Sequence, residues 1–592
     1  MKRTLFLIAC TALALTTYAF DRSEEEMKAI AAAKLNTAQM VKSLNTPATP
    51  VSIAKAMETS SYTIFEATSG EGFVIVSRDD NYPAVLGYST GAFNADMPCC
   101  MKWWLKGIEQ EMTQPNARRL APTKRAGQYT PVAPFIKSKW GQYDPFNRKC
   151  PKVDGELPPV GCVATSLAQA INYYQYPKSA QFESIYSIKD SNHENEVKVN
   201  SKYSFPFLDG YGYYFLDGYT SREDYQYVNP GIKGTLVAQL CVDCAYATYM
   251  TFDNSGSSSA TMYSATALTE KFGYPVESVK YANRSFLSDQ DQEKWNNIIY
   301  SEMQKKCPIL YGGTDAKDGG HAFILGGMDA DGLVYVDWGW NGSDDGYYDI
   351  TLMNPKTSGQ SFKEHQSMVY GIRTEPLPTD LPEPRIYSVD GNPYTFRITN
   401  ETDEAGQKHI AIHVHFTGGI VNYSTNTFDG MMGLFGTDVT EGRNWVIIDQ
   451  DSLQLESLSG YFLKQPAELY YYYVEDRLKP GHTYRLSFGG RDFAEDQWHS
   501  ILCYGGEIGY EIKYTGIPAT TTISEVKDVL YDGIRDIPST PLTAIDDGIT
   551  RVYDASGRLV HTVPTDQFNL WDIRSHGILI IKQGEKVRKV VR

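Results

Sequence analysis

Cys162 and His321 are the two residues of this chain best suited to nucleophilic chemistry. A thiol becomes a strong nucleophile when it loses its proton, and a nearby imidazole removes that proton well. Apolar residues recur at helical spacing after Cys162 as far as Tyr174, and Pro177 closes the pattern. The sequence therefore predicts a helix that begins at Cys162, where free N–H groups and the helix dipole favour a thiolate.

Asp337, Trp338 and Gln142 are candidates for the groups that support this pair. Asp337 ends a predicted strand beyond a hairpin that starts at His321, so its carboxylate would accept the imidazole N–H and fix the tautomer. Trp338 would shield that bond from water. Gln142 lies in an irregular segment before the cysteine, and its amide would donate to an oxyanion together with the N–H of Cys162. These are the roles that a Cys–His peptidase requires.

Each of these residues also has a plainer explanation when it is considered alone. A single cysteine is most often a buried structural thiol, and a single histidine is most often a satisfied core residue. Gln142 would be a surface amide, and Asp337 would belong to an aromatic core turn. The catalytic interpretation is favoured because the features occur together. Gly320, directly before His321, adds the freedom that a mobile loop beside a cleft requires.

Composition limits the classes of partner and cofactor. The chain has 592 residues and a net charge of −16, which allows several domains and argues against a nucleic-acid partner. Nine cysteines are few for this length, so disulfides do not build the fold. Cys241 and Cys244 have CxxC spacing without a second such pair, and Cys99, Cys100 and Cys503 show no readable role. We therefore predict no cofactor and no metal site.

The N-terminal part has the features of a secreted precursor. Lys2 and Arg3 precede an apolar run, and the pattern is that of a signal peptide over residues 1–19. Residues 20–115 form a first unit, and the stretch 116–127 that follows it is polar, basic and without periodicity. We interpret this stretch as an activation linker cut by a protease, with a simple linker as the alternative.

The rest of the chain divides into three parts. Residues 128–375 show helical patterns followed by alternating strands, which predicts an α+β peptidase domain. A proline-rich linker follows at 376–384. Residues 386–540 alternate as strands and predict a β-sandwich of unknown role. Residues 545–592 contain further short strands.

Several stretches around the candidate residues carry specific motifs. They are Val160–Thr165 (VGCVAT), Gly319–Phe323 (GGHAF), Trp338–Trp340 (WGW), Gly72–Ser77 (GFVIVS), Asp79–Asp80 and Tyr82–Tyr88 (YPAVLGY).

These motifs resemble the streptopain family of papain-like cysteine peptidases and their propeptide, over roughly residues 20–375. The resemblance implies that residues 20–127 are a propeptide. It also implies a prodomain that occludes the cleft of an endopeptidase, with a preference for an apolar side chain two residues before the scissile bond. By position, Cys162 matches the nucleophile, His321 the base and Gln142 the oxyanion donor. The substrate groove is expected at Trp338, Trp340 and Gly320. The sequence departs from the family pattern at Asp337, where asparagine is usual, and at Asn341, where glycine is expected.

The C-terminal stretch 545–592 resembles a type IX secretion sorting domain. Leu579 stands where tyrosine is common in such domains, and an ordinary terminal β domain is the alternative. The matching residues are Val552–Asp554, Gly557–Val560, Gly577–Ile578 and Lys589–Val591.

The sequence thus predicts a multidomain secreted or cell-surface cysteine endopeptidase made as a zymogen. Its expected partners are protein or peptide substrates, its own propeptide as an intramolecular inhibitor, and the type IX secretion machinery at the outer membrane. Two alternatives stay open. One is a transglutaminase-like acyltransferase with the same Cys–His–Asp chemistry, and the other is a surface adhesin in which the peptidase part is inert.

Overall fold

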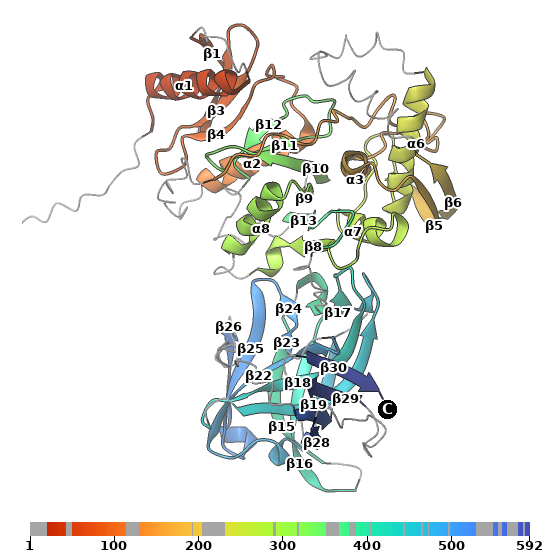
Figure 1. The fold of residues 1–592 in the computed structure, drawn as a ribbon. Helices are drawn as coiled ribbons and strands as arrows, with labels where there is room; N and C mark the ends of the chain where they lie inside the picture. The colour runs from red at the N-terminus through yellow and green to blue at the C-terminus, as the bar shows by residue number, and fades with distance from the viewer. Residues whose placement is uncertain are drawn as a thin grey trace, which may run out of the picture. The chain divides into compact units, whose positions relative to one another are not determined.

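The computed structural model divides the chain into two compact units, residues 1–436 with 446–528 and residues 437–445 with 529–592. Figure 1 shows the fold. The predicted signal peptide and activation linker lie outside the described residues. The structure describes residues 21–42, 50–113, 129–191, 193–203, 231–287, 292–315, 319–350, 366–377, 386–391, 393–402, 405–441, 444–462, 466–471, 473–494, 498–527, 549–554, 559–564, 578–583 and 586–591.

A ten-stranded sheet forms the centre of the first unit and joins the N-terminal segment, residues 21–113, to the predicted peptidase part. The join is antiparallel pairing of β4 with β12, where Tyr88 lies opposite Tyr347 and Gly87 opposite Tyr348. In spatial order the strands are β1 (Ile53–Glu58), β2 (Tyr62–Ala67), β3 (Phe73–Ser77), β4 (Val85–Ser89), β12 (Gly346–Tyr348), β11 (Val334–Asp337), β10 (Gly319–Met328), β9 (Ile309–Asp315), β13 (Gln366–Tyr370) and β8 (Lys280–Asn283).

Helices cover both faces of this sheet (Figure 1). One face packs against α2 (Cys99–Met112) and α8 (Gln292–Gln304) in a single hydrophobic core. On the other face α1 (Glu24–Lys42) covers the N-terminal strands, and α3 (Cys162–Tyr174) with α6 (Gly231–Ala247) covers the strands of the peptidase part. The predicted mixture of helices and strands is confirmed, but the N-terminal segment and the peptidase part share one sheet.

Local sequence explains where α1 begins. The N–H of Ser23 donates to the Glu26 carboxylate at 2.8 Å, and the N–H of Glu26 donates to Ser23 Oγ at 3.3 Å. This reciprocal pair satisfies backbone donors that the first helical turn leaves free. Ser23 and Glu26 therefore cap the start of α1.

Helix α1 also reaches the hairpin turn between β10 and β11. Lys34 Nζ lies 2.9 Å from Asp329 Oδ2 and 2.8 Å from Asp331 Oδ2, and it stands 4.4 Å from the ring centroid of Tyr88. Tyr88 donates from its hydroxyl to Asp329 at 3.2 Å. Because the side chains of Lys34 and Asp329 are only 14% and 12% exposed, this contact ties the N-terminal segment to the peptidase part.

Two smaller elements flank the main sheet. A three-stranded sheet pairs β5 (Ser179–Ile188) with β6 (Glu194–Lys202) and β7 (Thr251–Phe252). A short helix, α7 (Tyr263–Thr266), continues into a π-helical turn at Ala267–Lys271.

The C-terminal part of the first unit is built from strands, as the alternation in residues 386–540 predicts. Two sheets with the orders β19-β18-β22-β25-β24-β14-β17-β20 and β15-β16-β21 contribute to one hydrophobic core. The all-β prediction is confirmed for the described residues, and the sandwich architecture stays a prediction. The strands are β14 (Ile386–Ser388), β15 (Thr395–Thr402), β16 (Lys408–Phe416), β17 (Gly419–Asn422), β18 (Phe428–Asp438), β19 (Asn444–Leu455), β20 (Gly460–Phe462), β21 (Ala467–Tyr471), β22 (His482–Asp492), β23 (His499–Ser500), β24 (Leu502–Cys503), β25 (Gly506–Tyr514) and β26 (Thr522–Lys527).

The second unit contains a four-stranded antiparallel sheet with the order β28-β27-β29-β30. Short strands are what the sequence predicts there. No helix among the described residues has the length and apolar character that a membrane crossing needs. The strands are β27 (Ile549–Asp554), β28 (Leu559–Pro564), β29 (Ile578–Gln583) and β30 (Lys586–Val591).

Candidate active site

Cys162 is the first residue of α3, as predicted. The chain enters the helix through Gly161, whose φ of 96° lies in the left-handed region. A Cβ at this position would lie 2.7 Å from Met250 Cε and 3.3 Å from the carbonyl oxygen of Ser257. Glycine is therefore required both by the turn and by the close packing, and it places the thiol at the N-terminus of the helix.

The fold brings Cys162 next to His321, which lies on β10. The backbone N–H of Ala322 donates to Cys162 Sγ at 3.3 Å. Ala322 has its N–H available because β11 ends at Asp337, opposite Ile324, and strand pairing on that side of β10 stops there. Cys162 and the backbone of Ala322 thus meet at the point where β11 ends and stops pairing with β10.

The imidazole of His321 forms a hydrogen bond with a thiol other than that of Cys162. Its Nδ1 lies 3.3 Å from Sγ of Cys99, at the start of α2 in the N-terminal segment, and this is the ring's one hydrogen bond among the described residues. A hydrogen bond from Cys100 and the contact with His321 lower the pKa of Cys99 to about 5. Burial raises the pKa of Cys162 to about 11. In this state the thiol in contact with the imidazole of His321 is therefore Cys99, while Cys162 contacts the backbone N–H of Ala322.

Cys100 completes the group of sulfur atoms at this place. It is fully buried, and its Sγ lies 3.9 Å from Cys99 Sγ. It donates to the carbonyl oxygens of Ala322 and Trp338, each at 3.8 Å. The peptide of Ala322 is thus contacted by Cys162 through its N–H and by Cys100 through its carbonyl. Cys99 and Cys100, which show no readable role in the sequence, thus lie beside the strand that carries His321.

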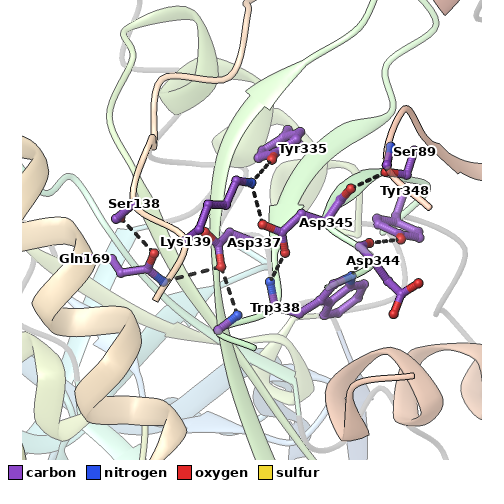
Figure 2. A network of polar contacts seen from close by, with 12 residues as sticks. Ser89, Ser138, Lys139, Gln169, Tyr335, Asp337, Trp338, Asp344, Asp345 and Tyr348 are labelled. Carbon is purple, nitrogen blue, oxygen red and sulfur yellow. Dashed lines mark hydrogen bonds and ion pairs between the residues drawn. The ribbon is translucent and has the colours of Figure 1, made fainter. Parts of the chain in front are cut away.

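Asp337 is fully buried but lies away from the imidazole. Figure 2 shows its surroundings. The N–H of Gly339 donates to its carboxylate at 2.9 Å and the amide of Gln169 donates at 3.4 Å. Burial, and then the charge of Asp345, raise its pKa to about 8. Its position on β11 is opposite Ile324, so the described contacts do not include the bond to His321 that the sequence predicts.

A partly buried lysine lies beside this carboxylate. Lys139 Nζ lies 2.5 Å from Asp345 Oδ2 and also donates to Tyr335, as Figure 2 shows. Asp345 in turn accepts from the N–H of Trp338 at 3.0 Å and, through its carbonyl, from Ser89 Oγ at 2.5 Å. This network fixes the chain just after β11, and sequence reasoning did not find it.

The two tryptophans of the WGW motif have different surroundings. Trp338 is fully buried, and its ring packs against Phe323, Tyr348 and, from α2, Trp104. Trp340 is partly buried, and its ring centroid lies 6.3 Å from that of Tyr143. In this state Trp338 therefore belongs to the core that the N-terminal segment shares with the sheet.

Gln142 lies beside the start of α3, as predicted. Its carbonyl accepts from the N–H of Val160 at 2.9 Å, and its side chain is buried.

The neighbouring residue Gly141 is covered by Asn341, because a Cβ on Gly141 would lie 2.5 Å from Asn341 Oδ1. Asn341 has a φ of 54°, a left-handed conformation that fits the glycine expected there.

Gly320 is exposed and lies on β10 opposite Thr314 of β9. On β9, Gly313 lies opposite His321, and its lack of a side chain leaves space for a residue of the N-terminal segment. A Cβ on Gly313 would lie 2.1 Å from the Trp103 ring, whose side chain is 2% exposed. The indole of Trp103 therefore packs directly on the strand that pairs with the histidine strand.

Comparison with known proteins tests this assignment. Residues 140–348 match the model of the peptidase C10 family, and residues 11–112 match that of the Spi protease inhibitor. The chain is 28% identical over 385 residues to streptopain of Streptococcus pyogenes, which covers 60% of this chain and 92% of streptopain. The chain belongs to the peptidase C10 family. Its catalytic domain is that of a cysteine peptidase, preceded by an inhibitor-like prodomain.

Two further matches are a curated relative and a solved structure. The thiol protease/hemagglutinin PrtT of Porphyromonas gingivalis is 27% identical over 402 residues, which are 62% of this chain but only 44% of PrtT. A solved fragment of prointerpain A from Prevotella intermedia is 31% identical, with 55% of this chain and all of that fragment covered and a TM-score of 0.47.

Proposed function

We propose that this protein is a secreted cysteine endopeptidase made as a zymogen, with Cys162 as nucleophile and His321 as base. The observation that carries the proposal is the position of Cys162 Sγ against the peptide of Ala322, one residue from His321. A small rearrangement of the imidazole toward Cys162 then completes the pair.

The reaction follows from these positions. Cys162 gives its proton to His321 and its sulfur attacks the carbonyl carbon of the substrate. The backbone N–H of Cys162 and the amide of Gln142 donate to the oxyanion. His321 returns the proton to the amine that leaves, and water then hydrolyses the thioester. Trp340 and Gly320 line the substrate groove, which accepts an apolar side chain two residues before the scissile bond. Trp338, which is buried in this state, joins the groove once the prodomain leaves.

The contact between Cys99 and His321 supports a specific form of latency. While Nδ1 of His321 faces Cys99, it is not available to take a proton from Cys162. The prodomain, residues 20–127, thus inhibits by holding the base as well as by covering the cleft. Cleavage in the linker 116–127 releases it from the papain-like domain, residues 128–375.

The two terminal segments of the chain serve export. We assign residues 1–19 to a signal peptide and 545–592 to a type IX sorting domain recognised at the outer membrane. The β-rich domain at 386–540 is an additional sandwich whose role in the enzyme is open.

A direct test is the intact mass of the full chain incubated in reducing buffer, with and without iodoacetamide added at the start. Self-processing within residues 116–127 is expected without the reagent, and its arrest is expected with the reagent bound at Cys162. Addition of an amine donor separates hydrolysis from acyl transfer, since only an acyltransferase incorporates the amine. Processing that continues after Cys162 is fully alkylated would contradict the proposal.

The ion pairs of Lys34 give a second prediction. Lys34→Met leaves Asp329 largely buried without its counter-ion, which costs roughly 1–3 kcal/mol in the docked state. We expect the time for half of the zymogen to process itself to fall about tenfold, as measured by gel densitometry.

Lys28→Met is the matched control on the same helix. Its ion pair with Glu24 is exposed, with side chains 45% and 47% accessible. Such a pair contributes little, so processing should keep the parent rate. Equal rates for Lys34→Met and Lys28→Met would show that the Lys34 contact does not hold the prodomain.

A further inference from the structure

The sulfur atoms of Cys99 and Cys100 and Nδ1 of His321 all lie within 4.8 Å of one another. They come from the prodomain and from the catalytic strand, with 222 positions between Cys99 and His321. We propose that this cluster is a Zn²⁺ site of the zymogen, which clamps the catalytic histidine to helix α2.

The types of ligand fit this ion. Zn²⁺ is bound in proteins mainly by cysteine sulfur and histidine nitrogen, and a Cys₂His set with one open position is an established arrangement. Thiolate ligands select soft or borderline ions over Mg²⁺ and Ca²⁺, which require oxygen ligands. Each thiol releases its proton to solvent when it binds the metal, and the imidazole binds in its neutral form.

The separations of the ligand atoms also fit. With Zn–S near 2.3 Å and Zn–N near 2.0–2.1 Å, tetrahedral geometry places two sulfurs about 3.8 Å apart and sulfur and nitrogen about 3.5 Å apart. The structure has 3.9 Å between the two sulfurs and 3.3 Å between Cys99 Sγ and His321 Nδ1. Two of the three separations thus match the tetrahedral values, and the third, from Cys100 Sγ to the imidazole, lies within 4.8 Å and would shorten when the ion binds.

The surroundings favour a closed and preorganised site. Cys100 is fully buried and Cys99 and His321 are partly buried, so water takes only the remaining coordination position. Cys100 Sγ is held between the carbonyls of Ala322 and Trp338, and α2 is fixed below by Trp103 and Trp104 in the core. A ligand set held in this way loses little conformational freedom when the ion binds.

The site would strengthen latency, and this consequence rests on the proposed function. A metal bound to Nδ1 of His321 prevents the ring from turning to Cys162, so the metal must leave before the enzyme activates. The bound ion then slows activation of the zymogen, and a chelator that removes the ion should speed it.

The test measures metal binding on the full chain carrying Cys162→Ala, which cannot process itself. Titration with Co²⁺ is expected to give one ion per chain, with a thiolate-to-cobalt charge-transfer band and visible bands of tetrahedral intensity, displaced by Zn²⁺. Cys99→Ser, Cys100→Ser and His321→Gln are each expected to weaken binding at least about 100-fold. Cys503→Ser, which changes another buried thiol in the β-rich domain, should bind as the parent does.

The outcomes separate cleanly. Loss of the charge-transfer band in the three ligand variants with retention in Cys503→Ser supports the site. Absence of binding in the parent, or equal binding in the ligand variants, overturns it. Because Cys100 is buried, circular dichroism is used to check that the Cys100→Ser variant folds. If that variant is unfolded, the result of His321→Gln, at a partly exposed position, decides the proposal. The Cys162→Ala background keeps this result independent of peptidase activity.

Discussion

Replacing Cys162 with alanine is expected to lower kcat/KM for peptide hydrolysis by at least about 10⁴-fold, because no other group on the described surface of α3 can form the thioester. The residual rate comes from oxyanion donors and substrate binding alone. The measurement uses a fluorogenic peptide and protein that has been processed in trans by the parent enzyme, since the variant cannot process itself.

Cys241→Ala is the control for the general effect of removing a thiol. Cys241 is fully buried on α6 in the same domain, with no contact to the catalytic strand described. Its variant should retain activity within a few-fold of the parent after correction for folded protein. A Cys162→Ala enzyme that still hydrolyses the peptide at the parent rate would exclude Cys162 as the nucleophile.

The second large effect is expected at the packing of Trp103 on Gly313. Trp103→Ala removes a nearly buried indole from the contact with β9, and such a loss typically costs about 3–5 kcal/mol. Because the contact exists only while the prodomain is docked, the open state should become about 10²- to 10³-fold more populated. The rate at which a small thiol reagent labels Cys162 in the uncut chain, followed by peptide mapping, should rise accordingly.

Two variants sharpen this prediction. Lys102→Ala, on the same helix with a side chain 51% exposed, should label at the parent rate. Gly313→Val should act in the same direction as Trp103→Ala, since its side chain would collide with the indole. If both act through one contact, the double variant gains less than the product of the single effects. Unchanged labelling in Trp103→Ala would show that the prodomain is held elsewhere.

Local patterns in the sequence predicted those parts of the site that depend on neighbours along the chain. The helix that begins at Cys162 and the strand that carries His321 follow from apolar spacing, from Gly161 and from the alternation after Gly319. The left-handed conformation at Asn341 likewise agrees with the glycine expected there.

Long-range packing decided the rest. Asp337 meets Ile324 because the β10–β11 pairing contains a register shift between Leu325 and Met328, and no local signal encodes such a shift. The role of Cys99 depends on how α2 docks on β10, so adjacent cysteines in an amphipathic segment could not reveal it. Adjacent cysteines in the propeptide are the one sequence signal that points to this contact with the active site.

The backbone pairing of β4 with β12 has a consequence for the enzyme after activation. Loss of the prodomain uncovers one border of the sheet, with N–H and C=O groups that the prodomain had satisfied. Unpaired edge strands of this kind can pair with strands of other chains and promote aggregation. Because β12 contains only Gly346–Tyr348, the uncovered edge is too short to start aggregation by strand addition. The released peptidase can therefore lose its prodomain without aggregating at this edge.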